Sequence, residues 1–242
     1  MPGTMAGMGR TMAGGTLYLM RALLPDRPGA LGAFATAIGA AGGDIASVEV
    51  VDREPAGALD DFVIRIDAAH LPELLAVASE VPGVRVETVR TYEGPIDIGH
   101  ELDLVDTLTE APALALALVA RVGAQAFKAS WAVVLESTRA GVTSRHGTPG
   151  APRLLWSSLP WLPLIGAVVL GWDDDWVPSS WIGADTALAA APIGSPNVAL
   201  LLGRAGGPSF RPAEVQRLGH LARMAATVSA AANGHPAPAP VS

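Results

Sequence analysis

The stretch LLPDRPGALGAF, from Leu23 to Phe34, decides how the first part of the chain folds. An apolar run stops at two opposite charges, a proline and a glycine, and a helix-like pattern follows directly. One face of the predicted helix carries Leu31, Phe34, Ala35 and Ile38, which recur at spacings of three and four. Residues 16–22, TLYLMRA, are β-forming side chains with partial alternation. We therefore expect a strand, a tight break and a helix, in this order.

The elements that follow complete a β-α-β-β-α-β order. The helix is expected to stop at AAGGD, and a strand, a hairpin turn at PAGALD, a second strand, an amphipathic helix and a last strand come next. The positions expected to be buried are Ile45, Val48 and Val50, then Phe62, Ile64 and Ile66, then Leu71, Leu74, Leu75 and Ala78, then Val84, Val86 and Val89. This order within about 75 residues is typical of a ferredoxin-like α+β domain, with two helices on one face of an antiparallel sheet. We expect a second copy of the chain to cover the other face or an edge.

The motif Asp26-Arg27-Pro28-Gly29-Ala30-Leu31, between a strand and a helix of such a unit, resembles the ACT domain over about residues 16–92. ACT domains are small regulatory modules that commonly bind amino acids, usually at an interface between two copies. The resemblance implies a ligand-binding site made by Asp26, Arg27, Pro28, Gly29, Ala30, Leu31, Asp44 and Ile45.

The same residues carry a physical argument for amino-acid binding. A helix N-terminus presents unpaired N–H groups and partial positive charge, which suits a carboxylate, and Gly29 lets a ligand approach the backbone. Asp44, where the family often has Asn, could hold an ammonium group or could repel a carboxylate. Two other interpretations stay open: Asp26 accepts local backbone N–H groups, and the module serves only for dimerisation.

The second half of the chain is expected to mix strands and helices. Strands are expected at WAVVLES, LIGAVVLGW, TALAAAPI and NVALLLGR, and helices at 101–110, from Pro112 and over the closing segment, with Ser209 or a neighbour as its cap. With Ala191, Pro192 and Ile193, the run Leu200–Arg204, and Phe210, Glu214 and Leu218, this half resembles a GAF domain over about residues 101–232. Residues 139–153, with little apolar content, are predicted to be a mobile loop. The predicted organisation is a disordered leader (1–15), an ACT domain (16–92), a linker (93–100), a GAF-like α+β domain with an antiparallel sheet flanked by helices (101–232) and a disordered tail (233–242).

Composition excludes several classes of function. The 242-residue chain has a net charge of -7 and no basic run, which argues against nucleic-acid binding. It has no cysteine, and no G-x-S-x-G or H-E-x-x-H motif, so we expect no catalytic residues, no metal site and no cofactor. Prolines and serines interrupt the apolar run 154–172, which favours a buried loop and strand over a membrane span. WDDDW at 172–176 is expected to be a solvated acidic turn, and the tryptophans to be core or interface residues.

The sequence therefore predicts a cytoplasmic, non-enzymatic regulatory protein. It is expected to form a homodimer, to bind an amino acid as a small-molecule signal in its ACT-like half, and to act through a partner protein. The alternative is a dimeric interaction scaffold that binds no ligand.

Overall fold

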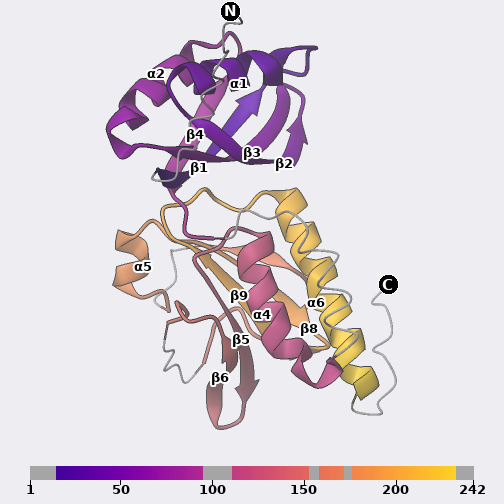
Figure 1. The fold of residues 1–242 in the computed structure, drawn as a ribbon. Helices are drawn as coiled ribbons and strands as arrows, with labels where there is room; N and C mark the ends of the chain where they lie inside the picture. The colour runs from indigo at the N-terminus through magenta and orange to yellow at the C-terminus, as the bar shows by residue number, and fades with distance from the viewer. Residues whose placement is uncertain (1–14, 95–110, 153–157, 172–175, 233–242) are drawn as a thin grey trace, which may run out of the picture.

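The computed structural model describes residues 15–94, 111–152, 158–171 and 176–232, which contain two antiparallel sheets (Figure 1). The predicted leader and tail, most of the linker, the helix expected at 101–110, Trp156 and the acidic turn lie outside the described residues. The predicted α+β class is confirmed in both halves of the chain.

The N-terminal domain has the predicted βαββαβ order and strand order β2-β3-β1-β4. Helices α1 and α2 lie on one side of this sheet, and the described residues from 111 onwards lie on the other side (Figure 1). Its elements are β1 (Thr16–Leu24), α1 (Ala30–Ala40), β2 (Asp44–Glu54), β3 (Gly57–Ile66), a short 3-10 turn (Ala68–His70), α2 (Leu71–Glu80) and β4 (Arg85–Thr91).

The helix-covered face of this sheet holds the domain's main core. The Phe34 ring of α1 packs against the Phe62 ring of β3 with centroids 4.7 Å apart, and Ile38, Leu74 and Ala78 complete the contact. The prediction that Leu31 belongs to the buried stripe is wrong, because 48% of its surface is exposed. Ala30 takes the buried position instead, one turn before Phe34.

Strand β2 departs from simple alternation, and this changes which valine is buried. Its register against β3 shifts between Ile45 and Ser47 and again between Val50 and Asp52. The extra residue of the second shift is Val51, which is only 6% exposed. The prediction that Val50 is buried is wrong: Val50 pairs with Asp60 on the face that Val48 also uses, but β2 is an edge strand and Val50 is 47% exposed.

The C-terminal domain has a five-stranded sheet of order β6-β5-β9-β8-β7, in which all neighbouring strands are antiparallel. Its elements are a 3-10 turn (Pro112–Leu114), α4 (Ala115–Ala126), β5 (Trp131–Thr138), β6 (Gly141–Gly147), β7 (Val168–Leu170), α5 (Ser179–Gly183), β8 (Ala187–Ile193), β9 (Ser195–Arg204) and α6 (Pro212–Ala232). The three central strands are almost continuously apolar because both faces of the sheet are covered.

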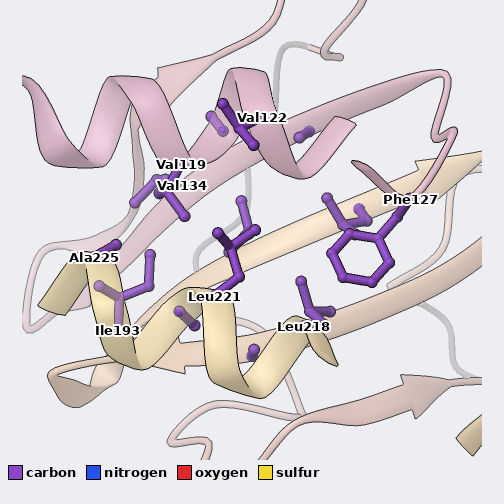
Figure 2. Packing of buried hydrophobic residues seen from close by; sticks show 14 of the residues in the cluster. Val119, Val122, Phe127, Val134, Ile193, Leu218, Leu221 and Ala225 are labelled. Carbon is purple, nitrogen blue, oxygen red and sulfur yellow. The ribbon is translucent and has the colours of Figure 1, made fainter. Parts of the chain in front are cut away.

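Helices α4 and α6 cover one face of this sheet side by side (Figures 1 and 2). Figure 2 shows Val119 and Val122 of α4 and Leu218, Leu221 and Ala225 of α6 directed into one cluster. The cluster also contains Val134 of β5 and Ile193 of β8 (Figure 2). The predicted stripe of the closing helix is thereby confirmed at its buried positions.

The prediction of a mobile loop over residues 139–153 is wrong for its first half. Residues Gly141–Gly147 form β6, which pairs with β5 from Thr138↔Gly141 to Val133↔Gly147. The segment has few apolar residues because β6 is an edge strand whose side chains are mostly exposed. Conversely, among the described residues of the predicted strand LIGAVVLGW, only Val168–Leu170 form a strand.

The burial of Val51 at the bulge of β2 can be tested against its neighbour Val50. We expect Val51→Ala to lower the free energy of unfolding by about 2 kcal/mol, because it removes buried methyl groups. The matched change Val50→Ala should alter it by less than about 0.5 kcal/mol. Urea denaturation of both variants measures the difference, and equal effects would contradict the burial described for these two valines.

Candidate functional site

The loop between β1 and α1 gives the first candidate site. Gly29 is the N-cap of α1, with φ 84° in the left-handed region, and no side chain caps the helix. A Cβ at Gly29 would have no atom within 4 Å, so the backbone is open to an approaching group. Asp26, Arg27, Pro28 and Leu31 are all exposed at this end of the domain. The loop therefore presents a helix N-terminus to solvent without a competing side chain.

Not every donor that the sequence analysis assigned to a ligand is available. The Ala30 N–H donates to the Arg27 carbonyl at 3.2 Å, so it already has an acceptor. Arg27 donates from Nη2 to the Pro82 carbonyl at 3.0 Å, which ties the loop to the segment before β4. Within the described residues no hydrogen bond to the Asp26 side chain is found, so the expectation that it accepts local N–H groups receives no support. Gly29 and Leu31 are left as the donors nearest to a ligand.

Asp44 and Ile45 do not join this loop within one chain. Asp44 opens β2 opposite Arg65, and Arg65 in turn pairs with Leu17, at the start of β1. The loop follows Leu24 at the other end of β1, so the two groups are separated by about seven residues of strand, or about 23 Å. Asp44 is exposed and accepts from Arg65 Nη1 at 3.5 Å, and Ile45 is half-buried against the core. A site that uses both groups therefore needs a second copy of the chain.

Asp60 is an acidic residue near the loop that the sequence analysis missed. It pairs with Ala22 of β1 and lies two positions from the loop end of the ladder, on the same face of β3 as Phe62. Its side chain is 5% exposed, and within the described residues Oδ1 has no hydrogen-bond partner. Burial raises the pKa of Asp60, with Arg53 acting in the opposite direction. Its only sequence signal is a pair of acids, Asp60 and Asp61, inside a strand.

The open face of the first sheet meets the C-terminal domain at a buried group of charges. Arg21 of β1 is fully buried and donates to both oxygens of Asp61, at 2.7 and 2.9 Å. It also donates to Glu214 of α6, at 3.0 and 3.2 Å. Arg204 of β9 donates to Glu214 at 2.6 Å, and Lys128 Nζ pairs with Glu49 and Asp61. We call Arg21, Glu49, Asp61, Lys128, Arg204 and Glu214 the interdomain charge cluster.

Glu214 also organises the start of α6. Its Oε2 accepts the Arg211 N–H at 2.9 Å, so a glutamate in the first turn, rather than Ser209, satisfies the backbone there. Burial would raise the pKa of Glu214, but attraction to Arg204 and hydrogen bonds from Arg21 and Arg204 outweigh it and lower the pKa to about 2. The expected covering of the sheet by a second copy is thus replaced, at this end, by the chain's own C-terminal domain.

The other face of the second sheet is filled rather than hollow. Trp131 and Trp181 have ring centroids 4.8 Å apart, and Trp176 lies 5.7 Å from Trp161 and 6.2 Å from Trp181. They pack with Leu159, Leu164 and the strand residues of this face. The interpretation of these tryptophans as core residues is therefore confirmed for the four that are described.

Comparison with known proteins fits the loop geometry. Residues 18–83 match the model of the ACT domain family. The N-terminal domain is an ACT domain. No curated protein matches the chain in sequence. Among solved structures, a GAF domain/HD domain protein from Geobacter sulfurreducens is 19% identical with a TM-score of 0.41, over 53% of this chain and 97% of that chain. The GAF domain of a phosphoenolpyruvate-protein phosphotransferase from Acinetobacter is 13% identical with a TM-score of 0.41, over 57% of this chain and 97% of that chain.

The ACT domain gives the chain a regulatory module. Among the described residues, no group of three or more His, Asp or Glu side chains suited to a metal ion is found. The helices of the same residues include none that is long and apolar enough to cross a membrane. Two features of the described residues stand out. One is the exposed loop before α1 of the ACT domain, and the other is the charged contact between the domains.

The interdomain charge cluster predicts how stability depends on pH. The folded-state pKa of Glu214 lies below its ordinary value, so its contribution is present above about pH 4.5 and is lost as the pH falls towards 2. The difference between the ordinary pKa of Glu214 and its folded-state pKa corresponds to about 3 kcal/mol of unfolding free energy. We expect Glu214→Gln to lower the free energy of unfolding at pH 7 by about 3–5 kcal/mol, since it leaves buried cations uncompensated.

Urea denaturation at pH 7, 4 and 2.5 measures both effects. Between pH 4.5 and 2, the unfolding free energy of Glu214→Gln should fall much less than that of the wild type. Glu136→Gln, which removes a surface partner of Arg145, is the matched control and should keep the wild-type pH dependence. A wild-type pH dependence in Glu214→Gln would contradict the role given to this carboxylate.

Proposed function

We propose that the protein is a cytoplasmic, non-enzymatic sensor that binds a free amino acid at the β1–α1 loop of its ACT domain. The observation that carries the proposal is the uncapped N-terminus of α1, with an open glycine at its N-cap, in a chain that matches the ACT family. Because the sequence has no cysteine and no G-x-S-x-G or H-E-x-x-H motif, we propose that the output passes to a partner protein.

The ligand carboxylate is placed at the first turn of α1. The N–H groups of Gly29 and Leu31 and the partial positive charge of the helix end favour an anion there. Leu31, which is exposed beside these donors, offers apolar surface to the ligand side chain. The loop that carries this half of the proposed site is supported by Arg27, which donates to the Pro82 carbonyl.

The ligand ammonium is placed at Asp44 of a second copy, which makes the binding unit a homodimer. This follows from distance, because Asp44 of the same chain lies at the far end of the sheet. The C-terminal domain occupies part of the open face of the ACT sheet, which leaves the exposed edges of that sheet for a second copy. Asp60 is the acceptor that would serve if the site lay within one chain.

Leu31 allows the carboxylate position to be tested without damage to the fold. Leu31→Glu places a negative charge in the first turn of α1, where it stabilises the helix by about 0.3–1 kcal/mol. The same charge repels a ligand carboxylate, so we expect amino-acid affinity to fall about tenfold or more. Leu31→Gln, the neutral control of equal size, should bind like the wild type. Thermal-shift screening with the common amino acids, followed by calorimetry, provides the measurement.

The position proposed for the ligand ammonium group can be tested by substituting two aspartates. We expect Asp44→Ala to weaken binding by about 1.5–3 kcal/mol, the worth of a charge-assisted hydrogen bond, and Asp60→Asn to leave binding unchanged. Arg65→Gln, which frees Asp44 from its ion pair, should not weaken binding. Sedimentation velocity should show a dimer at micromolar concentration. Loss of binding in Asp60→Asn alone would move the site into a single chain.

A screen in which no amino acid raises the melting temperature would favour the alternative function. A ligand at about 100 times its dissociation constant should stabilise the folded protein by about 2.7 kcal/mol, which such a screen detects easily. Without any such effect, a dimer would point to an interaction scaffold.

A further inference from the structure

Most cationic side chains at the contact between the two domains form ion pairs with carboxylates. Arg21 pairs with Asp61 and Glu214, and Lys128 pairs with Glu49. The other ion pairs of this contact are Arg204–Glu214, Arg211–Glu54, Arg211–Glu87 and Arg217–Glu49. Arg90, near the end of β4, differs from all of these. Among residues 15–94, 111–152, 158–171 and 176–232 it has no carboxylate within ion-pairing distance.

The Arg90 guanidinium is also short of hydrogen-bond acceptors. Nη2 donates to the Lys128 carbonyl, whereas Nε is buried and has no acceptor within the described residues. Burial, followed by the nearby positive charge of Arg204, lowers the pKa of Arg90 to about 10. A cation in this situation gains from any anion that comes within reach, because little of its lost hydration has been replaced.

Arg90 lines a pocket of about 490 Å³ between the two domains. The ACT side of the pocket includes Arg90, Tyr92 and Glu93, and the other side includes Gln125, Ser130 and Gly206. A Cβ at Gly206 would lie 3.9 Å from Cβ and Cδ of Arg90, so this loop passes along the arginine stem. The volume lies in the range of small-molecule sites, and the lining supplies polar side chains from both domains.

A strained residue forms part of the same wall. Lys128 follows α4 with φ 47°, a left-handed conformation that residues with side chains adopt at a cost of about 1 kcal/mol or more. Its Nζ reaches Glu49 on the ACT domain, and its carbonyl receives Arg90. Lys128, in the C-terminal domain, therefore binds two residues of the ACT domain beside the pocket.

We propose that this interdomain pocket binds a small metabolite through an oxyanion, either a carboxylate or a phosphate, held by Arg90. The planar guanidinium presents N–H donors that match both groups. A bound ligand contacts β4 of the ACT domain on one side and the α4–β5 turn on the other, so its binding favours one arrangement of the domains. This site is separate from the β1–α1 loop and does not depend on the proposed amino-acid site.

The test uses the full chain, with succinate and inorganic phosphate as oxyanion probes and succinamide as a neutral probe. Calorimetry should show saturable binding of succinate, of phosphate or of both below about 10 mM, and no binding of succinamide. Which oxyanion binds more tightly identifies the class of metabolite. Arg90→Gln should weaken binding about tenfold or more. Arg85→Gln, which changes an exposed arginine on the same strand, should leave it unchanged.

Two further measurements separate a bridging ligand from surface charge effects. Amide hydrogen exchange in residues 90–94 and 125–130 should slow together when the oxyanion binds, and Leu31→Glu should bind it like the wild type. The proposal is overturned if neither oxyanion binds, if succinamide binds as well as succinate, if Arg90→Gln binds like the wild type, or if exchange slows on one side of the pocket only.

Discussion

The arrangement of the chain depends on the hydrogen bonds of the buried Arg21 guanidinium. It binds Asp61 of its own sheet and Glu214 of the distant helix α6. A buried cation without partners would cost far more than this chain's marginal stability allows, so its two carboxylates have to stay in place. Asp61 comes from the neighbouring strand, but Glu214 comes from 193 residues further along the chain. The orientation of the C-terminal domain on the ACT sheet is therefore specified by hydrogen-bond geometry as well as by apolar contact.

This contact links the candidate ligand loop to the rest of the protein. Arg21 lies on β1 four positions before Pro25, where the loop begins, and its Nη1 reaches α6. A shift of β1 on ligand binding would change the geometry at Glu214, which also accepts from Arg204 and from the first turn of α6. The interdomain pocket at Arg90 lies on β4, which pairs directly with β1.

Periodicity predicted most of the ACT domain because the residues that face its helices recur at regular spacing. Phe62, Ile64 and Ile66 alternate along β3, although the residues between them on the other face are also mostly buried, and Phe34 and Ile38 follow the spacing of a helix. The errors occurred where local pattern and tertiary context disagree. Val51, the extra residue of a bulge in β2, is buried where Val50 was expected to be, and β6 was missed because an edge strand needs few apolar residues. The spacing of hydrophobic residues predicts neither where a bulge occurs nor whether a strand lies at the edge of a sheet.

By itself, the sequence determined the order of elements in the ACT domain and the loop DRPG that precedes α1, because turn residues and periodicity are local properties of the chain. The tertiary structure alone decided that Asp44 lies far from this loop, that Asp60 lies near it, and that Arg21, Glu214 and Arg204 meet. Each of these depends on strand order or on contacts between distant segments. A charged residue in an apolar strand, such as Arg21 or Asp61, indicates that a partner is required, but only the folded chain determines which residue supplies it.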